Sequence, residues 1–210
     1  MRTRMMVAVV LSSVLLLSTA NAAPVPMGAP ATFVGTGNMY QMYQDTAGIG
    51  WIAAEAYASS TAVPPTGFEN GHLASILTAA ENAFVVALRS TVTGGTPSAW
   101  LGGNDITTTN MWEWSDGSGV FWIQGGSGLQ PGFFAAWGGG EPNGGNVAFP
   151  GGEWSLELRA DGLWNDLSTQ NQSWFVAEFT PIPVPEPATA GLALMGLGGL
   201  VGAMRRRRIA

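Results

Sequence analysis

The sequence predicts an α+β fold, and three features of the chain support this prediction. Short apolar and aromatic runs bounded by glycine come first, and two segments with apolar residues at helical spacing follow them. Several further short apolar runs then follow a glycine pair, together with one long glycine-rich stretch. Strands, then helices, then strands again is the order of an α+β domain.

The expected elements begin with two short strands, at 32–34 and 38–43. The segment 51–59 (WIAAEAYAS) carries apolar residues at helical spacing and predicts a first helix. Residues 71–76 (GHLASI) are expected to form a strand or a turn.

A second helix is predicted from Thr78, as its N-cap, through Arg89. Glu81 stands at the third helical position, where it completes a capping box with Thr78. The pair Gly94-Gly95 ends this region. The remaining apolar runs predict strands at 111–114, 120–123, 154–158 and 173–179. A long loop is expected at 125–152, between the second and third of these strands.

Residues 1–22 predict a secretory signal peptide. Two arginines form a positive n-region, residues 5–17 form an apolar h-region, and Ala20-Asn21-Ala22 fits the small-x-small cleavage rule. The mature chain is therefore expected to start at Ala23. An uncleaved membrane anchor is the alternative, which the short apolar run and the cleavage site disfavour.

The other end of the chain predicts a sorting signal. A Pro-rich linker at 181–187 contains Pro185, Glu186 and Pro187, an apolar stretch at 188–204 follows, and the end at 205–210 carries Arg205, Arg206, Arg207 and Arg208. The apolar stretch is barely long enough to span a bilayer, and the basic tail should stay cytoplasmic. This tripartite tail resembles the PEP-CTERM sorting signal of Gram-negative bacteria.

That resemblance implies recognition by an exosortase and cleavage near the Pro-Glu-Pro motif. The protein would contact the inner membrane transiently through its transmembrane segment, and would then be released to the cell surface or an extracellular matrix. An ordinary C-terminal membrane anchor is the alternative.

Between the two ends, residues 23–180 are sufficient for one domain with a sizeable core. Only Arg89 and Arg159 lie outside the two end signals, against fourteen acidic residues, so the mature chain has a charge near −12. Such a chain is not drawn to nucleic acid or to an anionic lipid surface, but it attracts divalent cations. The absence of cysteine excludes a disulfide framework, so hydrophobic packing has to hold the domain together, with or without the help of a metal.

A series of short motifs resembles the C-type lectin-like domain over most of residues 33–180. Each motif is weak alone, but eight of them follow in that family's order: Trp51 with Ala54, Gly71 to Ile76, Glu81 to Val85, Trp100 to Asp105, Trp112 to Gly117, Phe134 to Trp137, Glu141-Pro142-Asn143 and Trp164-Asn165-Asp166. The resemblance implies two helices, antiparallel sheets and a long calcium-binding loop.

Five side chains with hard oxygen atoms lie close together in the sequence: Glu141, Asn143, Glu153, Asn165 and Asp166. Carboxylate and amide oxygens are the ligands that Ca²⁺ takes, and carboxylates brought close together repel one another unless a cation lies between them. By the resemblance, Glu141 and Asn143 would coordinate the ion from the long loop, with Pro142 in the cis form. Asn165 and Asp166 would complete the site from a neighbouring strand, and Glu153 has the spacing of the family's remaining carboxylate ligand.

The resemblance also implies a sugar ligand. In the family, the Glu-Pro-Asn order goes with mannose- and glucose-type sugars, whose vicinal hydroxyls bind the metal and the same side chains, here Glu141, Asn143, Glu153 and Asn165. The aromatic residues Trp137, Phe149 and Trp154 lie near the long loop and are candidates to stack on a sugar face. Four further tryptophans, Trp112, Trp114, Trp164 and Trp174, are expected to lie in the core.

This chain departs from the family at two sets of positions. The family's disulfide positions correspond to small residues here, Ala58 with Ala177 and Ser155 with Thr169. Of the family's auxiliary calcium site only Asp105 is present, while Thr109, Gly144 and Trp154 stand at its partner positions. One calcium site is therefore expected, not two.

An enzyme is not expected. His72 is the only histidine, which disfavours a zinc hydrolase and a Ser-His-Asp set. Glu141 and Glu153 could in principle serve glycoside hydrolysis, but carboxylates committed to a metal cannot easily act as acid and base.

The sequence therefore predicts an exported, Ca²⁺-dependent carbohydrate-binding protein with polysaccharide as its partner, at the cell surface or in a biofilm matrix. The alternative is a structural matrix protein whose domain binds calcium or protein but no sugar.

Overall fold

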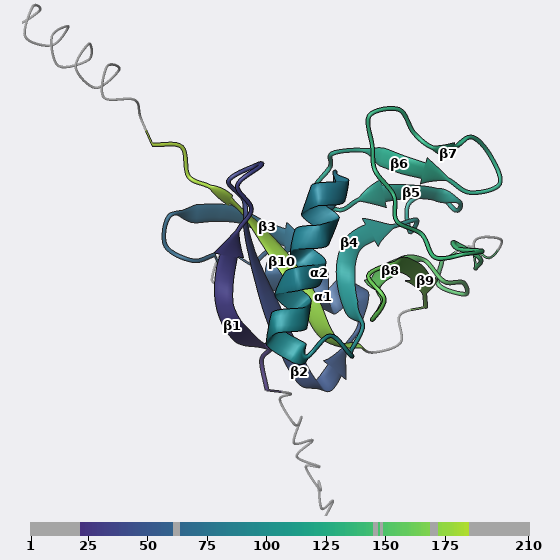
Figure 1. Cartoon of the computed structure of the whole chain (residues 1–210). Helices are drawn as coiled ribbons and strands as arrows, with labels where there is room; N and C mark the ends of the chain where they lie inside the picture. The colour runs from purple at the N-terminus through teal and green to yellow at the C-terminus, as the bar shows by residue number, and fades with distance from the viewer. Residues whose placement is uncertain (1–21, 61–63, 145–146, 148, 169–171, 185–210) are drawn as a thin grey trace, which may run out of the picture.

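The structure is a computed structural model that describes residues 22–184, apart from 61–63, 145–146, 148 and 169–171 (Figure 1). The predicted signal peptide, the Pro-Glu-Pro motif and the apolar and basic C-terminal segments lie outside the described residues. Neither helix in the part of the chain that the structure describes is long and apolar enough to cross a membrane.

Two helices and ten strands make up the described chain, which confirms the predicted α+β class. In chain order they are β1 (Val25–Thr32), β2 (Met39–Ile49), α1 (Trp51–Ala58), β3 (Phe68–Leu73), α2 (Ala79–Thr93), β4 (Ala99–Asn104), β5 (Met111–Trp114), β6 (Val120–Ile123), β7 (Gly128–Leu129), β8 (Ser155–Leu158), β9 (Trp164–Leu167) and β10 (Gln172–Pro181). The strands form one sheet in the order β1-β2-β10-β4-β5-β6-β7, with β3 pairing β10, β8 pairing β4, and β9 pairing β8. Every strand pair is antiparallel except β4 and β10, which are parallel.

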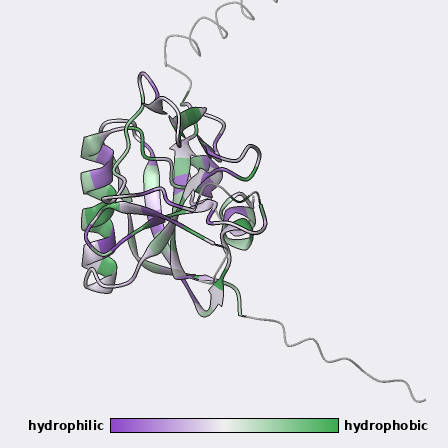
Figure 2. Cartoon of the chain, turned by 90° about the vertical axis from the view of Figure 1, so that its right-hand side faces the viewer, coloured by the Kyte–Doolittle hydropathy of each residue, from purple (hydrophilic) through white to green (hydrophobic). Residues whose placement is uncertain are grey.

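The two helices cover opposite faces of the central strands β2 and β10. Side chains alternate between the two faces of a strand, so Tyr40 and Met42 of β2 face the core under α2, whereas Tyr43 faces the core under α1. Strand β10 repeats the pattern, with Val176 on the α2 side and Phe175 on the α1 side. Figure 2 shows the long helix on one side of the strands and the short helix on the other.

The second helix begins as predicted. Thr78 is its N-cap, and Thr78 Oγ1 accepts a hydrogen bond from the Glu81 backbone N–H at 3.1 Å. The Glu81 carboxylate does not return to Thr78, as a capping box would require, but accepts from the Leu77 N–H at 2.6 Å. The helix continues past Arg89 to Thr93 and ends at Gly94, which adopts a left-handed conformation (φ 73°).

The first strand was expected at 32–34, and this expectation is wrong. Strand β1 begins at Val25 and ends at Thr32, and Phe33 instead starts a turn, in which its carbonyl accepts from the Gly37 N–H at 2.8 Å. The ring of Phe33 packs against Phe84 of α2, with ring centroids 5.4 Å apart. The apolar character of Phe33 therefore reflects a contact with the helix, and not a place in the sheet.

Ala58 and Ala177, the first pair of positions at which the family resemblance implies a disulfide, are held by hydrophobic packing instead. Ala58 and Ala177 are fully buried in the same hydrophobic cluster, together with Trp51, Phe175 and Phe179. Of the second pair, Ser155 is buried in β8, and Thr169 lies outside the described residues.

A pair of buried carboxylates shares one tyrosine hydroxyl in the core. The Tyr40 oxygen lies 2.5 Å from Glu81 Oε1 and 2.8 Å from Glu178 Oε1, and all three side chains are almost fully buried. A hydroxyl has one proton and can donate to only one of the two carboxylates. The other contact is satisfied when a carboxyl group carries a proton, and burial raises the pKa of Glu178 in agreement with this.

Folding should therefore become less favourable as the pH rises. A carboxyl group whose pKa is raised by folding contributes stability below its unfolded pKa of about 4.3, and loses it as the pH rises through the folded pKa. Glu178→Gln, which imitates the protonated form, should flatten this part of the stability curve. The difference between wild type and variant should change by at most about 1.4 kcal/mol per pH unit.

Urea unfolding measured at intervals from pH 4 to 9 tests this, with the exposed Glu69→Gln as the matched control. Parallel curves for wild type and Glu178→Gln would show that the two carboxylates do not share a proton.

Candidate functional site

The segment from Glu141 to Gly144, which we call the ligand loop, carries the first two candidate calcium ligands. The Glu141–Pro142 peptide bond is cis, as the family resemblance implies. Asn143 Nδ2 donates to Glu141 Oε2, so the two side chains lie against each other. Pro142 between them is buried, whereas Asn143 is exposed and Glu141 is partly exposed.

Asp166, in strand β9, binds the backbone of the ligand loop. Its carboxylate accepts from the Asn143 N–H at 3.0 and 2.9 Å and from the Gly144 N–H at 2.7 Å. Asp166 is completely buried, and the hydrogen bonds connect segments 22 and 23 residues apart. The structure thus brings together three of the five candidate ligands: Glu141, Asn143 and Asp166.

Glu153 also lies beside the ligand loop, next to Gly144. A Cβ atom placed on Gly144 would lie 2.9 Å from Glu153 Oε2, so the carboxylate lies against the backbone of the ligand loop. Burial raises the pKa of Glu153, and the charges of Asp166 and Glu157 raise it further. Glu153 is therefore a fourth member of the group.

Asn165 lies apart from the other candidate ligands. Neighbouring residues in a strand point to opposite faces, and the Asn165 side chain faces Glu157 of β8, its partner in the β8–β9 pairing. Asn165 Nδ2 donates to Glu157 Oε1 at 3.1 Å and to the Asp166 carbonyl at 2.6 Å. Sequence reasoning missed Glu157, because a charged residue between Leu156 and Leu158 is the ordinary alternation of a strand and does not mark a site.

The electrostatics of the site are dominated by negative charge. Burial raises the pKa of Glu141, and a hydrogen bond with Asp166 and the charges of Asp166 and Glu153 raise it further. Arg159 lowers it in part, but Arg159 is itself paired with Asp161 at 2.9 Å. Excess negative charge of this kind favours the binding of a cation.

The donor atoms present fit a calcium ion only as a mixed set. Among the residues that the structure describes, no three His, Cys, Asp or Glu side chains lie close enough together to hold a metal ion. A calcium site here consequently requires amide oxygens as well. Both asparagines use their Nδ2 atoms as donors, which leaves Asn143 Oδ1 and Asn165 Oδ1 without a hydrogen bond in the described part of the molecule. Carboxylate and amide oxygens together match the preference of Ca²⁺.

Asp105, which the family resemblance places at an auxiliary calcium site, accepts a hydrogen bond within a turn. It is buried, and its Oδ2 accepts from the Asn110 N–H at 2.9 Å. Burial raises its pKa. The prediction of a single calcium site stays a prediction.

The aromatic residues near the ligand loop differ in accessibility. Trp154 was a candidate to stack on a sugar, but it is 1% exposed and packs edge-to-face on Trp51, so this expectation is wrong for the structure described. Phe149 is 40% exposed and packs edge-to-face on Trp154, with ring centroids 4.6 Å apart. Its exposure makes Phe149 a better candidate than Trp154 to stack on a sugar. Trp137 is partly buried and packs against Trp112 and Trp164.

The predicted core tryptophans Trp112, Trp114 and Trp164 are buried, and Trp174 is partly buried against the same cluster. His72 is buried in β3, with Nδ1 donating to the Leu73 carbonyl at 2.9 Å, in keeping with a structural role.

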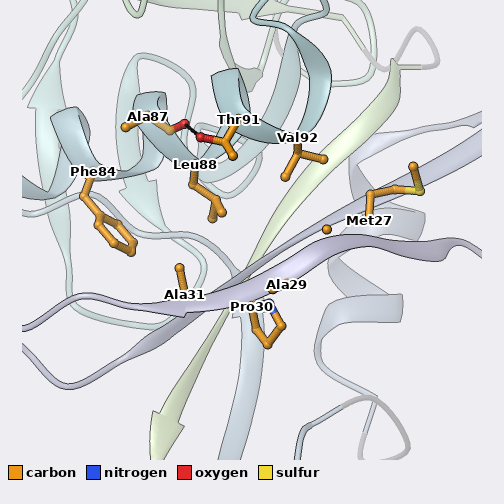
Figure 3. A pocket seen from close by; sticks show the side chains of 10 residues that line it. Met27, Ala29, Pro30, Ala31, Phe84, Ala87, Leu88, Thr91 and Val92 are labelled. Atoms are coloured by element: carbon orange, nitrogen blue, oxygen red, sulfur yellow. Dashed lines mark hydrogen bonds between the residues drawn. The ribbon is translucent and has the colours of Figure 1, made fainter.

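An apolar groove of about 510 Å³ lies between β1 and α2 (Figure 3). Met27, Ala31, Phe84, Leu88 and Val92 are among the residues that line it. The one hydroxyl in its lining, that of Thr91, donates to the Ala87 carbonyl within the helix. Neither β1 nor α2 contributes a residue to the candidate calcium site.

Comparison with known proteins found similarity in two parts of the chain. Residues 183–208 match the family model of the PEP-CTERM protein-sorting motif. The domain is similar to echinoidin from Heliocidaris crassispina, with 36% identity over 97 residues, which cover 44% of this chain and 58% of echinoidin. It is also similar to ladderlectin from Oncorhynchus mykiss, with 29% identity over 144 residues, which cover 68% of this chain and 63% of ladderlectin.

Among solved structures, the chain is similar to the C-type lectin CEL-I from Cucumaria echinata. The TM-score is 0.52 at 21% identity, and the match covers 68% of this chain and 91% of CEL-I. The chain spans less than two thirds of the length of the curated relatives named above.

Proposed function

We propose that this chain, which has the C-type lectin fold and ends in a PEP-CTERM sorting motif, is an exported Ca²⁺-dependent carbohydrate-binding protein. The observation that carries the proposal is the contact between the ligand loop and β9. The Asp166 carboxylate accepts hydrogen bonds from two backbone N–H groups of that loop, next to the side chains of Glu141 and Asn143, which are hydrogen-bonded to each other. This contact places hard oxygen atoms from two distant segments of the chain next to each other.

The residues that would hold the ion are Glu141, Asn143, Glu153, Asn165 and Asp166. Of these, Asn165 faces Glu157 and would have to turn toward the other four to coordinate the ion. Calcium would supply coordination positions for two vicinal hydroxyl oxygens of a sugar. The chain's own contribution to sugar binding would come from charge-assisted hydrogen bonds, with the carboxylates of Glu141 and Glu153 accepting from hydroxyls and the amides of Asn143 and Asn165 donating to them.

Sugar binding would change the contacts of both asparagines. Asn143 Nδ2 is bonded to Glu141, and Asn165 Nδ2 is bonded to Glu157 and the Asp166 carbonyl. To donate to a sugar hydroxyl, each amide has to exchange one of these bonds for a new one. Phe149 is exposed near the loop and could add an apolar contact to the sugar face.

The match to the sorting motif supports the part of the proposal that concerns export, because this motif indicates processing by an exosortase. The signal peptide at 1–22 and the transmembrane segment at 188–204 belong to the same proposal. The mannose- or glucose-type specificity comes from the Glu141-Pro142-Asn143 order, and the biological role would be to hold extracellular polysaccharide at the cell surface or in a matrix.

A glycan array probed once with Ca²⁺ and once with chelator tests this function. We expect binding to mannose- or glucose-type glycans that chelator abolishes, because the hydroxyl contacts depend on the ion. Mutual repulsion of Glu141, Glu153 and Asp166 also predicts that Ca²⁺ raises the melting temperature.

The structural alternative predicts a different combination of results. A Ca²⁺-dependent rise in melting temperature without any glycan signal would favour a matrix protein in which calcium only orders the loop. Glycan binding that survives chelation would contradict both proposals about the ion.

A further inference from the structure

Gln124 contacts the ligand loop at a point that none of the candidate calcium ligands reaches. It directly follows β6, and its Nε2 donates to the Pro142 carbonyl at 2.6 Å. Proline has no backbone N–H, so this carbonyl is its only backbone hydrogen-bonding group. Gln124 thereby fixes the middle residue of Glu141-Pro142-Asn143.

Gln124 is itself held by a chain of hydrogen bonds that starts at β4. Its backbone N–H donates to the Asn110 carbonyl at 2.9 Å, and the Asn110 N–H donates to Asp105 Oδ2 at 2.9 Å. Asn110 adopts a left-handed conformation (φ 69°), and Asp105, next to the end of β4, is 4% exposed. The backbone that carries the Gln124 side chain is therefore held in place by two hydrogen bonds that end at the buried Asp105.

The other side-chain atom of Gln124 shows what the amide contributes. Gln124 Oε1 is buried and has no hydrogen bond to any part of the chain that the structure describes. An unpaired buried oxygen costs free energy that an apolar side chain would avoid. The contribution that only the amide makes here is the hydrogen bond to Pro142.

The backbone of the ligand loop is thus held on both sides. Gln124 binds the carbonyl of Pro142, while Asp166 binds the N–H groups of Asn143 and Gly144. The Asp166 contact is made by a carboxylate that repels Glu141 and Glu153, whereas the Gln124 contact is neutral. Gln124 can therefore hold the loop even when no cation offsets that repulsion.

We propose that Gln124 is a positioning residue, which holds the ligand loop so that Glu141 and Asn143 present their oxygens together before an ion binds. The role toward calcium rests on the proposed function, but the role in holding the loop does not. A loop held in its binding conformation loses less freedom when the ion binds, so its affinity is higher.

Gln124→Met keeps the length of the side chain and removes the donor. In the metal-free protein we expect the amide protons of Asn143 and Gly144 to exchange about tenfold faster, the effect of one buried hydrogen bond. Calcium affinity, measured by calorimetry, should fall by a similar factor. The matched control is Gln130→Met, whose amide binds Ser127 Oγ and the Gly128 carbonyl in a nearby turn and does not contact the ligand loop.

The outcomes separate this inference from the proposed function. Unchanged exchange at Asn143 and Gly144, or an equal increase throughout the sheet, would overturn the positioning role, because the second result indicates general destabilisation. Faster local exchange with unchanged calcium affinity would overturn the role toward the metal. If the wild type binds no calcium but local exchange still rises in Gln124→Met, the proposed function fails and the holding of the loop stands.

Discussion

Replacing Asp166 with asparagine is expected to abolish measurable Ca²⁺ binding, with a loss of affinity of at least about a hundredfold. Asp166 is the one candidate ligand that also holds the ligand loop, since it accepts from the N–H groups of Asn143 and Gly144. The variant removes a buried charge from the site and leaves a single acceptor oxygen for those two groups. Calcium titration by calorimetry measures the effect.

The same substitution should alter the neighbouring carboxylates. The charge of Asp166 contributes to the raised pKa values of Glu141 and Glu153, so both pKa values should fall in Asp166→Asn, which NMR titration can follow. The free energy of unfolding of the metal-free protein should fall by about 1–3 kcal/mol, the cost of weakened hydrogen bonds to a buried charged group.

Asp161→Asn is the matched control for Asp166→Asn. Asp161 is 44% exposed and forms a surface ion pair with Arg159, an interaction whose loss costs about 1 kcal/mol or less. Its Oδ1 also accepts from the Leu163 N–H at 3.1 Å, a bond that the asparagine oxygen can keep. Calcium affinity should be unchanged in this variant. Retained affinity in Asp166→Asn would mean that the calcium site has been assigned to the wrong residues.

Replacing Trp164 with alanine should lower the free energy of unfolding by about 3–5 kcal/mol, the usual cost of deleting a large buried aromatic side chain. Trp164 is fully buried, and its ring lies within 5.6–5.9 Å of the rings of Trp114, Phe121, Phe134 and Trp137. Its indole N–H donates to Asn82 Oδ1 at 2.9 Å, which joins β9 to α2.

Thermal and urea unfolding test this second prediction, with Leu163→Ala as the control. Leu163 is the preceding residue and is 40% exposed, so its truncation should change stability by about 0.5 kcal/mol or less. A loss below about 1 kcal/mol in Trp164→Ala would mean that the aromatic cluster around it can close over the cavity. Because β9 also carries Asn165 and Asp166, calcium affinity should fall together with stability.

Features that depend on near neighbours in the chain could be predicted from the sequence. The N-cap at Thr78 is an example, because its hydrogen bond to Glu81 spans three residues and needs no other element. The side chain of Glu81 shows where prediction from near neighbours in the chain stops. Its carboxylate also contacts Tyr40 of β2, at 41 residues' separation, and this tertiary contact accompanies the shift of the carboxylate from Thr78 to Leu77.

The candidate site shows the same division. The acidic and amide residues could be found from composition and order, and Glu141 with Asn143 lie together because they are two residues apart. The orientation of Asn165 could not be predicted, because it depends on the β8–β9 register, which places Glu157 opposite it. Trp154 was misjudged for a similar reason, since only the tertiary fold places it under Phe149 and against Trp51.

The position of β10 has a mechanical consequence for the segment that follows it. This strand lies between β2 on one side and β3 and β4 on the other, and the sorting motif begins at residue 183, two residues beyond its end at Pro181. Tension on the C-terminal segment therefore acts on an internal strand, along its own axis. The hydrogen bonds between antiparallel strands run perpendicular to that axis, so a pull loads many of them at once in shear and does not open them one after another. A domain connected in this way resists being unravelled from its C-terminal end.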